Sequence, residues 1–245
     1  MKKENLVILL TGRGNNTLKD KNIKPIFKNP LLSYPAIAGK KVNGVTSFFA
    51  SSEDSKILTA AAACGYIPIE RPHEYSKPQS QHVDCLLHAL KIMREEYDLN
   101  PDILVVLLAN CATIKTEWIE DCINILKDNP SATSAIPVQR NNDHHPLRAK
   151  KINNEGYLKP FIGSDQKHIS SNRQDLESNY FVCHNFWALN LKNMSPDLSE
   201  GQKPWPFMGS RIIPYIVDCS IDVHHEEDIY LTEVWLKKNG LGEER

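Results

Sequence analysis

Strand-like and helix-like segments alternate along the first half of the chain, and this alternation limits the folds that it can adopt. The strand-like segments are short and apolar, and Ile103–Leu108 is a continuous Ile, Leu and Val run, as expected of a strand covered on both faces. Between them lie segments such as Val83–Tyr97, whose apolar residues recur at a helical period. The predicted strands are Leu6–Leu10, Val45–Ala50, Tyr66–Ile69, Ile103–Leu108 and Thr133–Val138, and the predicted helices are Leu31–Lys41, Ser55–Cys64, Val83–Tyr97 and Trp118–Leu126. This order predicts an α/β fold with a mainly parallel central sheet.

The alternation breaks down over Gln139–Asn179, which is polar and rich in Asn, His, Lys and Ser. This stretch is too long for an ordinary connection, so we predict that residues 139–185 form an inserted arm or lid within a single domain of residues 1–245. Regular structure is predicted again in the last third of the chain, at Tyr180–Leu189, Ile212–Val217, Ser220–Val223 and Glu226–Lys238. The last of these segments is acidic at its start and Lys-rich at its end, which is typical of a helix.

Composition and charge argue against several classes of function. The net charge is −1, so the chain lacks the basic excess that drives nucleic-acid binding. No apolar run approaches the ~20 residues needed to span a bilayer, and the run that begins at Leu6 is too short for a signal peptide. The six cysteines show no CxxC pair and no zinc-ligand spacing. We therefore expect a cytoplasmic protein with reduced cysteines that binds neither nucleic acid nor membranes.

Sheets of this kind bind ligands beyond the carboxyl ends of their strands, so the loops after the predicted strands are the places to look for chemistry. The loop Thr11–Asn22 follows the first buried strand directly. Its glycines permit close backbone approach to a ligand, and its cations suit a triphosphate, although it is not a P-loop. A solvated polar loop is the alternative interpretation. The candidate residues of this loop are Gly12, Arg13, Gly14, Asn15, Lys19, Lys21 and Asn22.

A second candidate site is the segment Ser220–Asp228 near the end of the chain. In a strand, Asp222 and His224 point to the same face, where a carboxylate and an imidazole can hold a divalent metal. The alternative is a helix-capping cluster, because the acids at 226–228 fit the first turn of a helix. Both interpretations can hold together.

Other polar residues give weaker signals. Arg173, within Asn172–Leu176, offers planar donors for a carboxylate, but Arg–Asp pairs are common on protein surfaces. The pair His144-His145 fits a solvated position better than a metal site. His82 and His88 flank a predicted helix start, where structural roles dominate.

The order and spacing of these segments resemble the acylneuraminate cytidylyltransferase family over nearly the whole chain. The loop from Gly12-Arg13-Gly14 to Lys21-Asn22-Ile23 resembles the family's ARxGSKGxxxKN. Residues 50–54 (ASSED) resemble its VSTDD, and Arg173-Gln174-Asp175-Leu176 reproduces its RQDL. The remaining matches are Glu70-Arg71-Pro72 to its Arg-Pro, Val83–Leu90 to its xDVVLHAL helix, Val105–Leu108 to the strand before its nucleotide loop, and Ser220–Asp228 to its SIDID-x3-D.

This resemblance implies a Rossmann-like nucleotidyltransferase fold, a three-layer sandwich with a protruding dimerisation arm, and hence a homodimer. It implies that CMP passes from CTP to the anomeric hydroxyl of an acidic, sialic-acid-like nonulosonate, with release of pyrophosphate. It also implies a divalent metal, Mg²⁺ or alternatively Mn²⁺, and a role in making cell-surface polysaccharide.

The resemblance also implies a role for each matched residue. Arg13, Lys19 and Lys21 neutralise the triphosphate, while Asn22, Arg71 and Asp84 contact the nucleotide. Asp222 binds the metal, with His224 as the second ligand. Arg173 and Gln174 meet the acidic sugar, partly across the dimer interface.

Several positions depart from the family pattern. The glycine loop is one residue shorter, and Asn16-Thr17-Leu18-Lys19 replaces its Ser-Lys-Gly. Asn110 stands near the usual nucleotide-facing Gln, and Cys183-His184 replaces the Asn-Gly that usually follows RQDL. His224 replaces an Asp, although Mg²⁺ prefers oxygen ligands. These changes indicate a divergent branch with an altered sugar.

Three alternatives to this function stay open at the level of sequence. The first is a nucleotidyltransferase for another acceptor, such as an eight-carbon keto-deoxy acid, a sugar phosphate or a phosphonate. The second is a non-catalytic nucleotide-binding homologue. The third is a glycosyltransferase in which Asp222-Val223-His224 acts as a DxD-like metal site, although its place near the C-terminus speaks against this.

Overall fold

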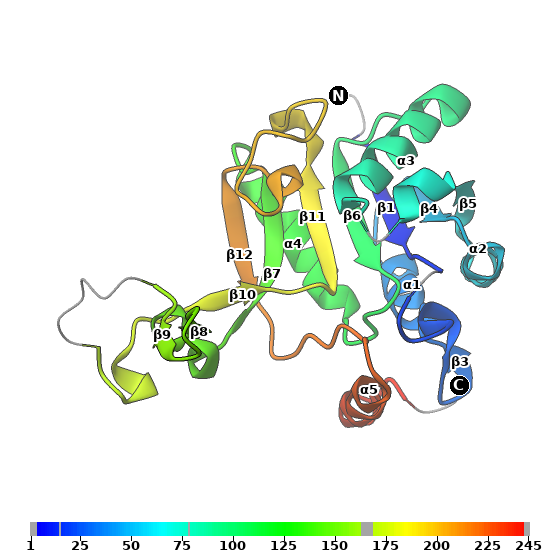
Figure 1. The fold of residues 1–245 in the computed structure, drawn as a ribbon. Coiled ribbons are helices and arrows are strands. Elements are labelled where there is room, and N and C mark those ends of the chain that lie inside the picture. Colours follow the sequence, from blue (N-terminus) through cyan, green and yellow to red (C-terminus); the bar gives the residue numbers. More distant parts are fainter. Residues whose placement is uncertain (1–3, 15, 78, 163–168, 243–245) are drawn as a thin grey trace.

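The structure, a computed structural model, describes residues 4–14, 16–77, 79–162 and 169–242. A mixed sheet of eight strands forms the centre of the described chain and has helices on both faces (Figure 1). Its strands are β1 (Leu6–Thr11), β4 (Ser47–Ser52), β5 (Ile67–Glu70), β6 (Ile103–Leu108), β7 (Ser134–Arg140), β10 (Tyr180–Val182), β11 (Phe186–Asn190) and β12 (Ile212–Ile216). The helices are α1 (Ser33–Lys40), α2 (Ser55–Ala63), α3 (His82–Tyr97), α4 (Thr116–Asp128) and α5 (Glu226–Lys238).

The strand order is β10-β7-β11-β6-β1-β4-β5, and β12 also pairs with β7. Strand β1 pairs in parallel with both β4 and β6, and β5 extends the parallel set beyond β4. Strand β11 runs antiparallel to its neighbours β6 and β7. The predicted mainly parallel sheet is therefore confirmed. The chain leaves β1 toward β4 and later returns to its other side at β6, so the switch point of the sheet lies between β1 and β6.

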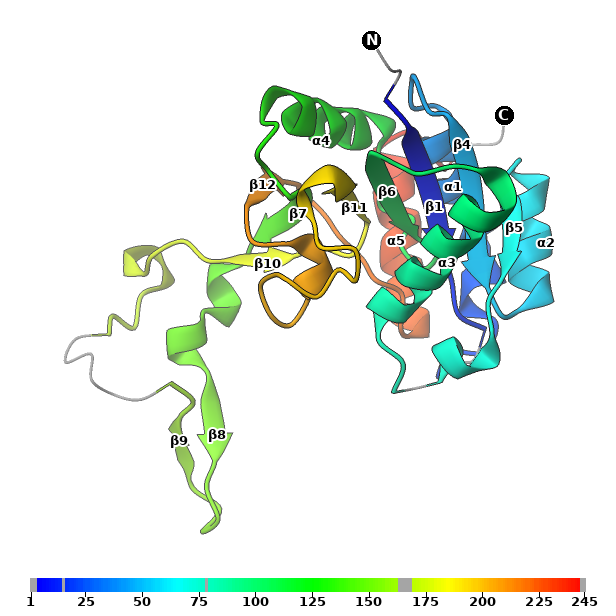
Figure 2. The same cartoon turned by 90° about the horizontal axis from the view of Figure 1, so that it is seen from above.

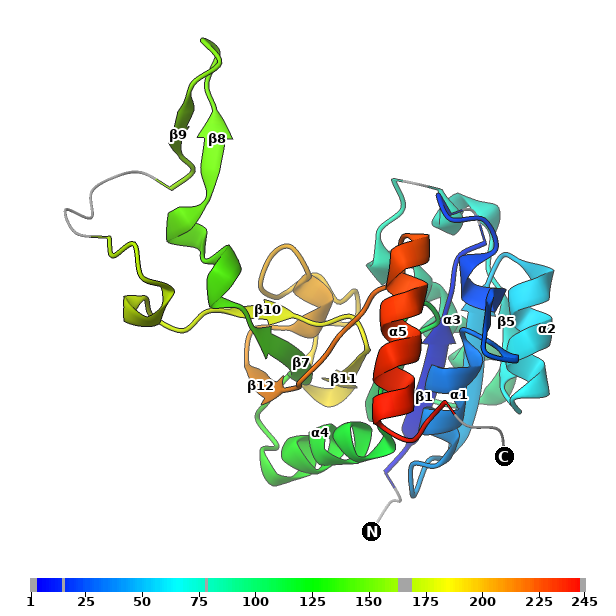
Figure 3. The same ribbon diagram turned by 90° about the horizontal axis from the view of Figure 1, so that it is seen from below.

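Alternation of side chains along the central strands creates a core on each face of the sheet. Val7 and Leu9 of β1 join the cluster that includes α3, whereas Ile8 and Leu10 join the cluster that includes α1, α2, α4 and α5. Seen from below, α5 lies beside α1 on this second face (Figure 3). Because β1 and β6 are buried on both faces, their sequences are apolar except for Thr11 at the end of β1.

Smaller elements complete the described chain. Strands β2 (Pro25–Ile26) and β3 (Asn29–Pro30) form a short ribbon after the 3₁₀ helix Lys21–Ile23. Strands β8 (Lys150–Ile152) and β9 (Leu158–Pro160) pair as an exposed hairpin. This hairpin lies away from the sheet, as an arm (Figure 2).

Most predicted elements are present, with a few differences. Helix α1 starts at Ser33, which places Pro35 in the first turn, where a missing N–H costs no hydrogen bond. The segment Tyr180–Leu189 is divided between β10 and β11. The prediction of a strand at Ser220–Val223 is wrong, because this segment bonds to the loop after β6 and not to a sheet neighbour.

Two further predictions concern the membrane and the cysteines. No helix among the described residues is long and apolar enough to cross a bilayer. All of the cysteines are free thiols, and each is buried or half-buried.

Candidate functional site

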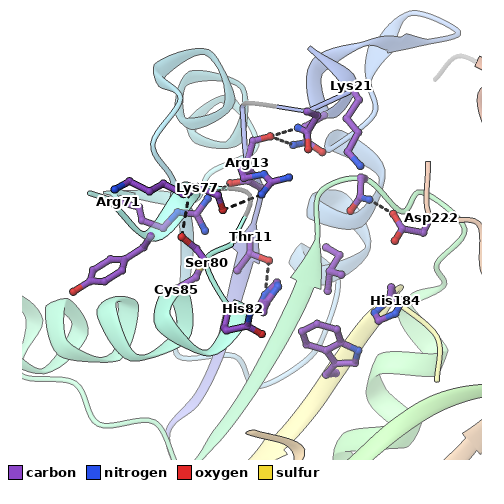
Figure 4. A pocket seen from close by; sticks show the side chains of 18 of the residues that line it. Thr11, Arg13, Lys21, Arg71, Lys77, Ser80, His82, Cys85, His184 and Asp222 are labelled. Carbon is purple, nitrogen blue, oxygen red and sulfur yellow. Dashed lines mark hydrogen bonds between the residues drawn. The ribbon is translucent and has the colours of Figure 1, made fainter. Parts of the chain in front are cut away.

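A cavity of about 320 Å³ opens at the carboxyl ends of β1 and β6, at the switch point of the sheet (Figure 4). Parallel strands direct their carboxyl ends to one edge of the sheet, so loops that are distant in sequence meet there. The predicted site residues that line it are Gly12, Arg13, Lys21, Asn22, Arg71, Asn110 and Asp222. The other lining residues are Thr11, Asn16, Tyr75, Lys77, Ser80, Gln81, His82, Cys85, Leu108, His184, Trp187 and Trp205.

The glycine loop that follows β1 is held by backbone and side-chain hydrogen bonds. The Gly12 N–H donates to Ser51 O at 3.2 Å, and the Asn22 side chain donates to Arg13 O at 2.8 Å. The Arg13 guanidinium donates to Lys77 O at 3.2 Å and so joins this loop to the opposite rim. Gly14 packs so closely that a Cβ there would overlap the Asp54 carboxylate. These contacts orient Arg13 toward the cavity.

Lys21 is a buried cation at the wall of the cavity. Its side chain is nearly enclosed, at 7% exposure, and its Nζ donates to Val223 O at 2.9 Å. Burial lowers the pKa of Lys21, Arg13 lowers it further, and Asp222 partly offsets both. A bound polyphosphate would supply the negative charge that favours the protonated amine.

A buried ion pair lies behind the glycine loop. The Arg71 guanidinium donates to Glu53 Oε2 at 2.8 Å, and both side chains are 6% exposed. Glu53 also accepts from the Gly14 N–H and from the Ser76 hydroxyl, each at 2.8 Å. The same Arg71 nitrogen donates to Gly12 O at 2.6 Å. The pair therefore joins the loops after β1, β4 and β5 and fixes Arg71 at the cavity wall.

Asp222 is positioned by the loop after β6. The Asn110 side chain donates to its carboxylate, and the Val223 N–H donates to Asn110 O at 3.0 Å. His224 Nε2 lies 3.1 Å from Asp222 Oδ2, so the two predicted metal ligands are adjacent although they are not in a strand. The acidic helix start is present too, because Asp228 accepts the N–H groups of His224 and His225 at 2.8 Å each. The helix-capping interpretation of this segment is therefore confirmed, and the metal interpretation stays a prediction.

The donor set at Asp222 fits a divalent cation only in part. Two ligands at about 2.1 Å in an octahedron lie about 3 Å apart, which matches the separation of Asp222 and His224. The described residues contain no group of three or more His, Cys, Asp or Glu side chains that could hold a metal. A cation there would take its remaining ligands from phosphate oxygens or water, as Mg²⁺ commonly does.

The opposite wall of the cavity carries aromatic residues that the sequence did not single out as functional. One of them is His82, for which the sequence predicted a structural role. Its Nε2 lies 3.3 Å from Thr11 Oγ1. Burial, with the nearby charge of Arg71, lowers the pKa of His82 to about 3. Burial also lowers the pKa of His184, against the opposing effect of Asp222. The sequence offered one signal for His184, because Cys183-His184 replaces the Asn-Gly of the family pattern. It offered no signal that Trp205 lines the cavity.

Some predicted site residues lie outside the lining of the cavity. Lys19 is exposed, and Gly14 and Asp84 are half-buried and are not among the lining residues. The Asp84 carboxylate caps α3 by accepting the Gln81 N–H at 3.1 Å. Arg173 and Gln174 are exposed in the 3₁₀ helix Arg173–Asp175, where Arg173 pairs with Asp143 at 2.8 Å. Asn15 lies outside the described residues.

Comparison with known proteins reveals similarity of structure. No protein-family model matches the chain, and no curated protein matches its sequence. A structure of CMP:2-keto-3-deoxy-manno-octonic acid synthetase complexed with CTP is similar, with a TM-score of 0.68, 15% identity, and 96% of this chain and 100% of that chain covered.

Two 4-diphosphocytidyl-2C-methyl-D-erythritol synthases are similar as well. The one from Anaerococcus prevotii DSM 20548 has a TM-score of 0.66 and 13% identity. The alignment covers 96% of this chain and 97% of that chain. The other has a TM-score of 0.63 and 10% identity, with 96% and 99% covered. At these identities the similarity shows a shared fold, and the predicted Rossmann-like nucleotidyltransferase fold is confirmed.

Proposed function

We propose that this protein transfers CMP from CTP to the anomeric hydroxyl of an acidic, sialic-acid-like sugar and releases pyrophosphate. The observation that carries this proposal is the meeting of Arg13 and Lys21 with Asp222 in one cavity at the switch point of the sheet. The similar solved structures support it, since one is a CMP:2-keto-3-deoxy-manno-octonic acid synthetase complexed with CTP and two are 4-diphosphocytidyl-2C-methyl-D-erythritol synthases by name.

The cations of the cavity suit the polyphosphate of CTP. Phosphoryl transfer needs in-line positioning and neutralisation of charge more than covalent help from the protein. Arg13 and Lys21 provide two donors on the glycine-loop side, and Lys21 is already dehydrated by burial. Their charge stabilises the pyrophosphate as it leaves the α-phosphorus.

The nucleoside would lie against Arg71, which the buried ion pair positions, and against two asparagines of the cavity wall. Arg71 and Asn22 line the cavity beside the glycine loop, and Asn110 lines it at the end of β6. Asn110 stands near the nucleotide-facing Gln of the family and binds Asp222 through its amide, which leaves its carbonyl as an acceptor. Asp84 and Gly14 act indirectly, by fixing the start of α3 and the shape of the loop.

We propose Mg²⁺ or Mn²⁺ as the metal, held by Asp222 with His224 beside it. When bound, the cation would neutralise the phosphates of CTP. Asn110 orients the Asp222 carboxylate toward the cavity, and the capped start of α5 fixes the backbone of His224.

The arm suggests how the acidic sugar is bound. Arg173 and Gln174 do not line the cavity of their own chain, so we propose a homodimer in which the arm reaches the cavity of a second copy. Apolar side chains on the arm support this, because they are largely exposed in the single chain and would be buried by a partner. They are Ile152, Tyr157, Leu158 and Phe161.

Pyrophosphate release from each of the four NTPs, with Mg²⁺ or Mn²⁺, tests the proposal against a panel of keto-deoxy acids. We expect pyrophosphate release only when CTP, and none of the other three NTPs, is combined with a nine-carbon acid. Release with an eight-carbon acid instead would correct the acceptor and keep the reaction. If the protein binds CTP but no acid or phosphorylated sugar supports release, the proposed activity is wrong and a non-catalytic role is favoured.

A further inference from the structure

Helix α5, drawn in red in Figure 3, carries apolar side chains on its exposed side as well as on its buried side. Trp235 and Leu236 pack into the core, whereas Tyr230, Leu231 and Val234 are 67%, 51% and 48% exposed. Val234 lies three and four positions after the other two, so the three exposed side chains share one side of the helix. Adjacent exposed apolar side chains of this kind indicate a surface of association.

Opposite charges stand at the two ends of this exposed side. Glu227 precedes the apolar residues, Lys238 follows them, and both side chains are exposed. They are 11 positions apart, which is about three turns of an α-helix, so they lie on the same side of α5 and about 16 Å apart along its axis. The helix macrodipole accounts for these charges, but not for the exposed apolar residues between them.

This side of α5 is complementary to itself about a two-fold axis. Glu227 and Lys238 have the same midpoint in the sequence as Leu231 and Val234. A two-fold axis through that midpoint, perpendicular to the helix, places α5 antiparallel to a second α5. Glu227 then lies opposite Lys238 of the partner subunit, and Leu231 lies opposite Val234 of the partner subunit. A parallel arrangement would instead bring like charges together, which repel.

We propose that the exposed side of α5 is a docking surface for a second copy of this chain, paired antiparallel about a two-fold axis. Burial of Tyr230, Leu231 and Val234 provides the free energy of association. The two symmetric pairs of Glu227 with Lys238 select the antiparallel orientation. Charge complementarity within one sequence favours a second copy over an unrelated partner, because each end of the helix supplies the charge that the other end requires.

This interface is separate from the arm and from the cavity. Its residues lie within α5, whereas the arm is formed by residues 139–185, and none of them lines the cavity. With three apolar side chains from each copy, the contact is small, so we expect reversible association in the micromolar range. If the arm also pairs two chains, the two contacts together join more than two copies.

Sedimentation velocity over a concentration series tests the apolar part of the interface. Leu231→Glu places a charge at its centre and should raise the Kd for self-association by at least about a hundred-fold. At high concentration the wild type should then have twice the mass of this variant, whether or not the arm adds a further contact. The position is exposed, so the Tm of the variant should stay close to that of the wild type.

Charge reversal tests the antiparallel pairing. Glu227→Lys and Lys238→Glu each turn two attractive pairs into two repulsive ones. Because one exposed pair changes affinity by about two- to five-fold, each variant alone should raise the Kd by about ten-fold. An equimolar mixture of the two variants should associate as tightly as the wild type, since every charged contact between them joins a Lys to a Glu.

Ile216→Glu and Lys127→Glu are the matched controls and should keep the wild-type Kd. Ile216, at the end of β12, is 63% exposed, and Lys127 is exposed on α4, so both substitutions are made outside α5. The proposal is overturned if the wild type and Leu231→Glu have the same mass at every concentration, or if the mixture of charge variants stays dissociated. These masses are measured without substrate, so a failure of the proposed reaction leaves the result unaffected.

Discussion

Replacing Glu53 by Gln should destabilise the protein strongly, because the substitution leaves Arg71 buried without its counter-charge. Both side chains are 6% exposed and 2.8 Å apart, so water cannot replace the lost partner. Removing one member of such a pair costs about 3–5 kcal/mol of unfolding free energy. For a chain of this length, about 2 °C of Tm per kcal/mol gives a decrease of at least about 6 °C.

Urea denaturation at pH 7, followed by circular dichroism, measures this cost. The exposed pair of Lys192 with Glu4, also 2.8 Å apart but with side chains 52% and 33% exposed, provides the matched control. Glu4→Gln should change the unfolding free energy by less than about 1 kcal/mol. If Glu53→Gln lowers the unfolding free energy by no more than Glu4→Gln does, the reasoning that burial makes this pair important is refuted.

The cost should also depend on pH. Burial raises the pKa of Glu53, but hydrogen bonds from Arg71, Gly14 and Ser76 outweigh it and leave the pKa below its ordinary value of 4.5. A carboxyl with a lowered folded pKa contributes stability that is fully present above the unfolded value and is lost as pH falls through the folded pKa. The difference between wild type and Glu53→Gln should therefore shrink as the pH falls below about 4.5. A difference that stays constant to low pH would contradict the ionic role of Glu53.

Three further substitutions test the proposed site. Lys21→Met should raise the Kd for CTP by about ten- to hundred-fold, the equivalent of about 1.5–3 kcal/mol for a charged hydrogen bond, and calorimetry showing an unchanged Kd would remove Lys21 from the phosphate site. Asp222→Ala should abolish metal-dependent pyrophosphate release while leaving Tm nearly unchanged, and full activity would exclude Asp222 as a metal ligand. Arg173→Ala should raise the KM for the acidic sugar far more than the KM for CTP, whereas equal effects would remove Arg173 from the sugar site.

The sequence by itself determined the elements whose signals are local. The apolar run Ile103–Leu108 corresponds to β6, and the charge distribution of Glu226–Lys238 corresponds to α5. Such signals depend on side-chain periodicity and helix ends, which neighbouring residues control. The alternation of these elements was enough for the fold class, because short parallel connections leave few ways to arrange them.

Only the tertiary structure decided which distant residues share a cavity. The amine of Lys21 donates to Val223, 202 positions away, and Ser220–Val223 forms no strand because the loop after β6 takes its N–H groups. His184 lies just before β11, and Trp205 lies in the irregular loop before β12. Their rings nevertheless pack against each other in one wall of the cavity. No local periodicity encodes these contacts. They arise where the sheet order reverses and loops from several strands converge, so long-range packing rather than sequence pattern brings them together.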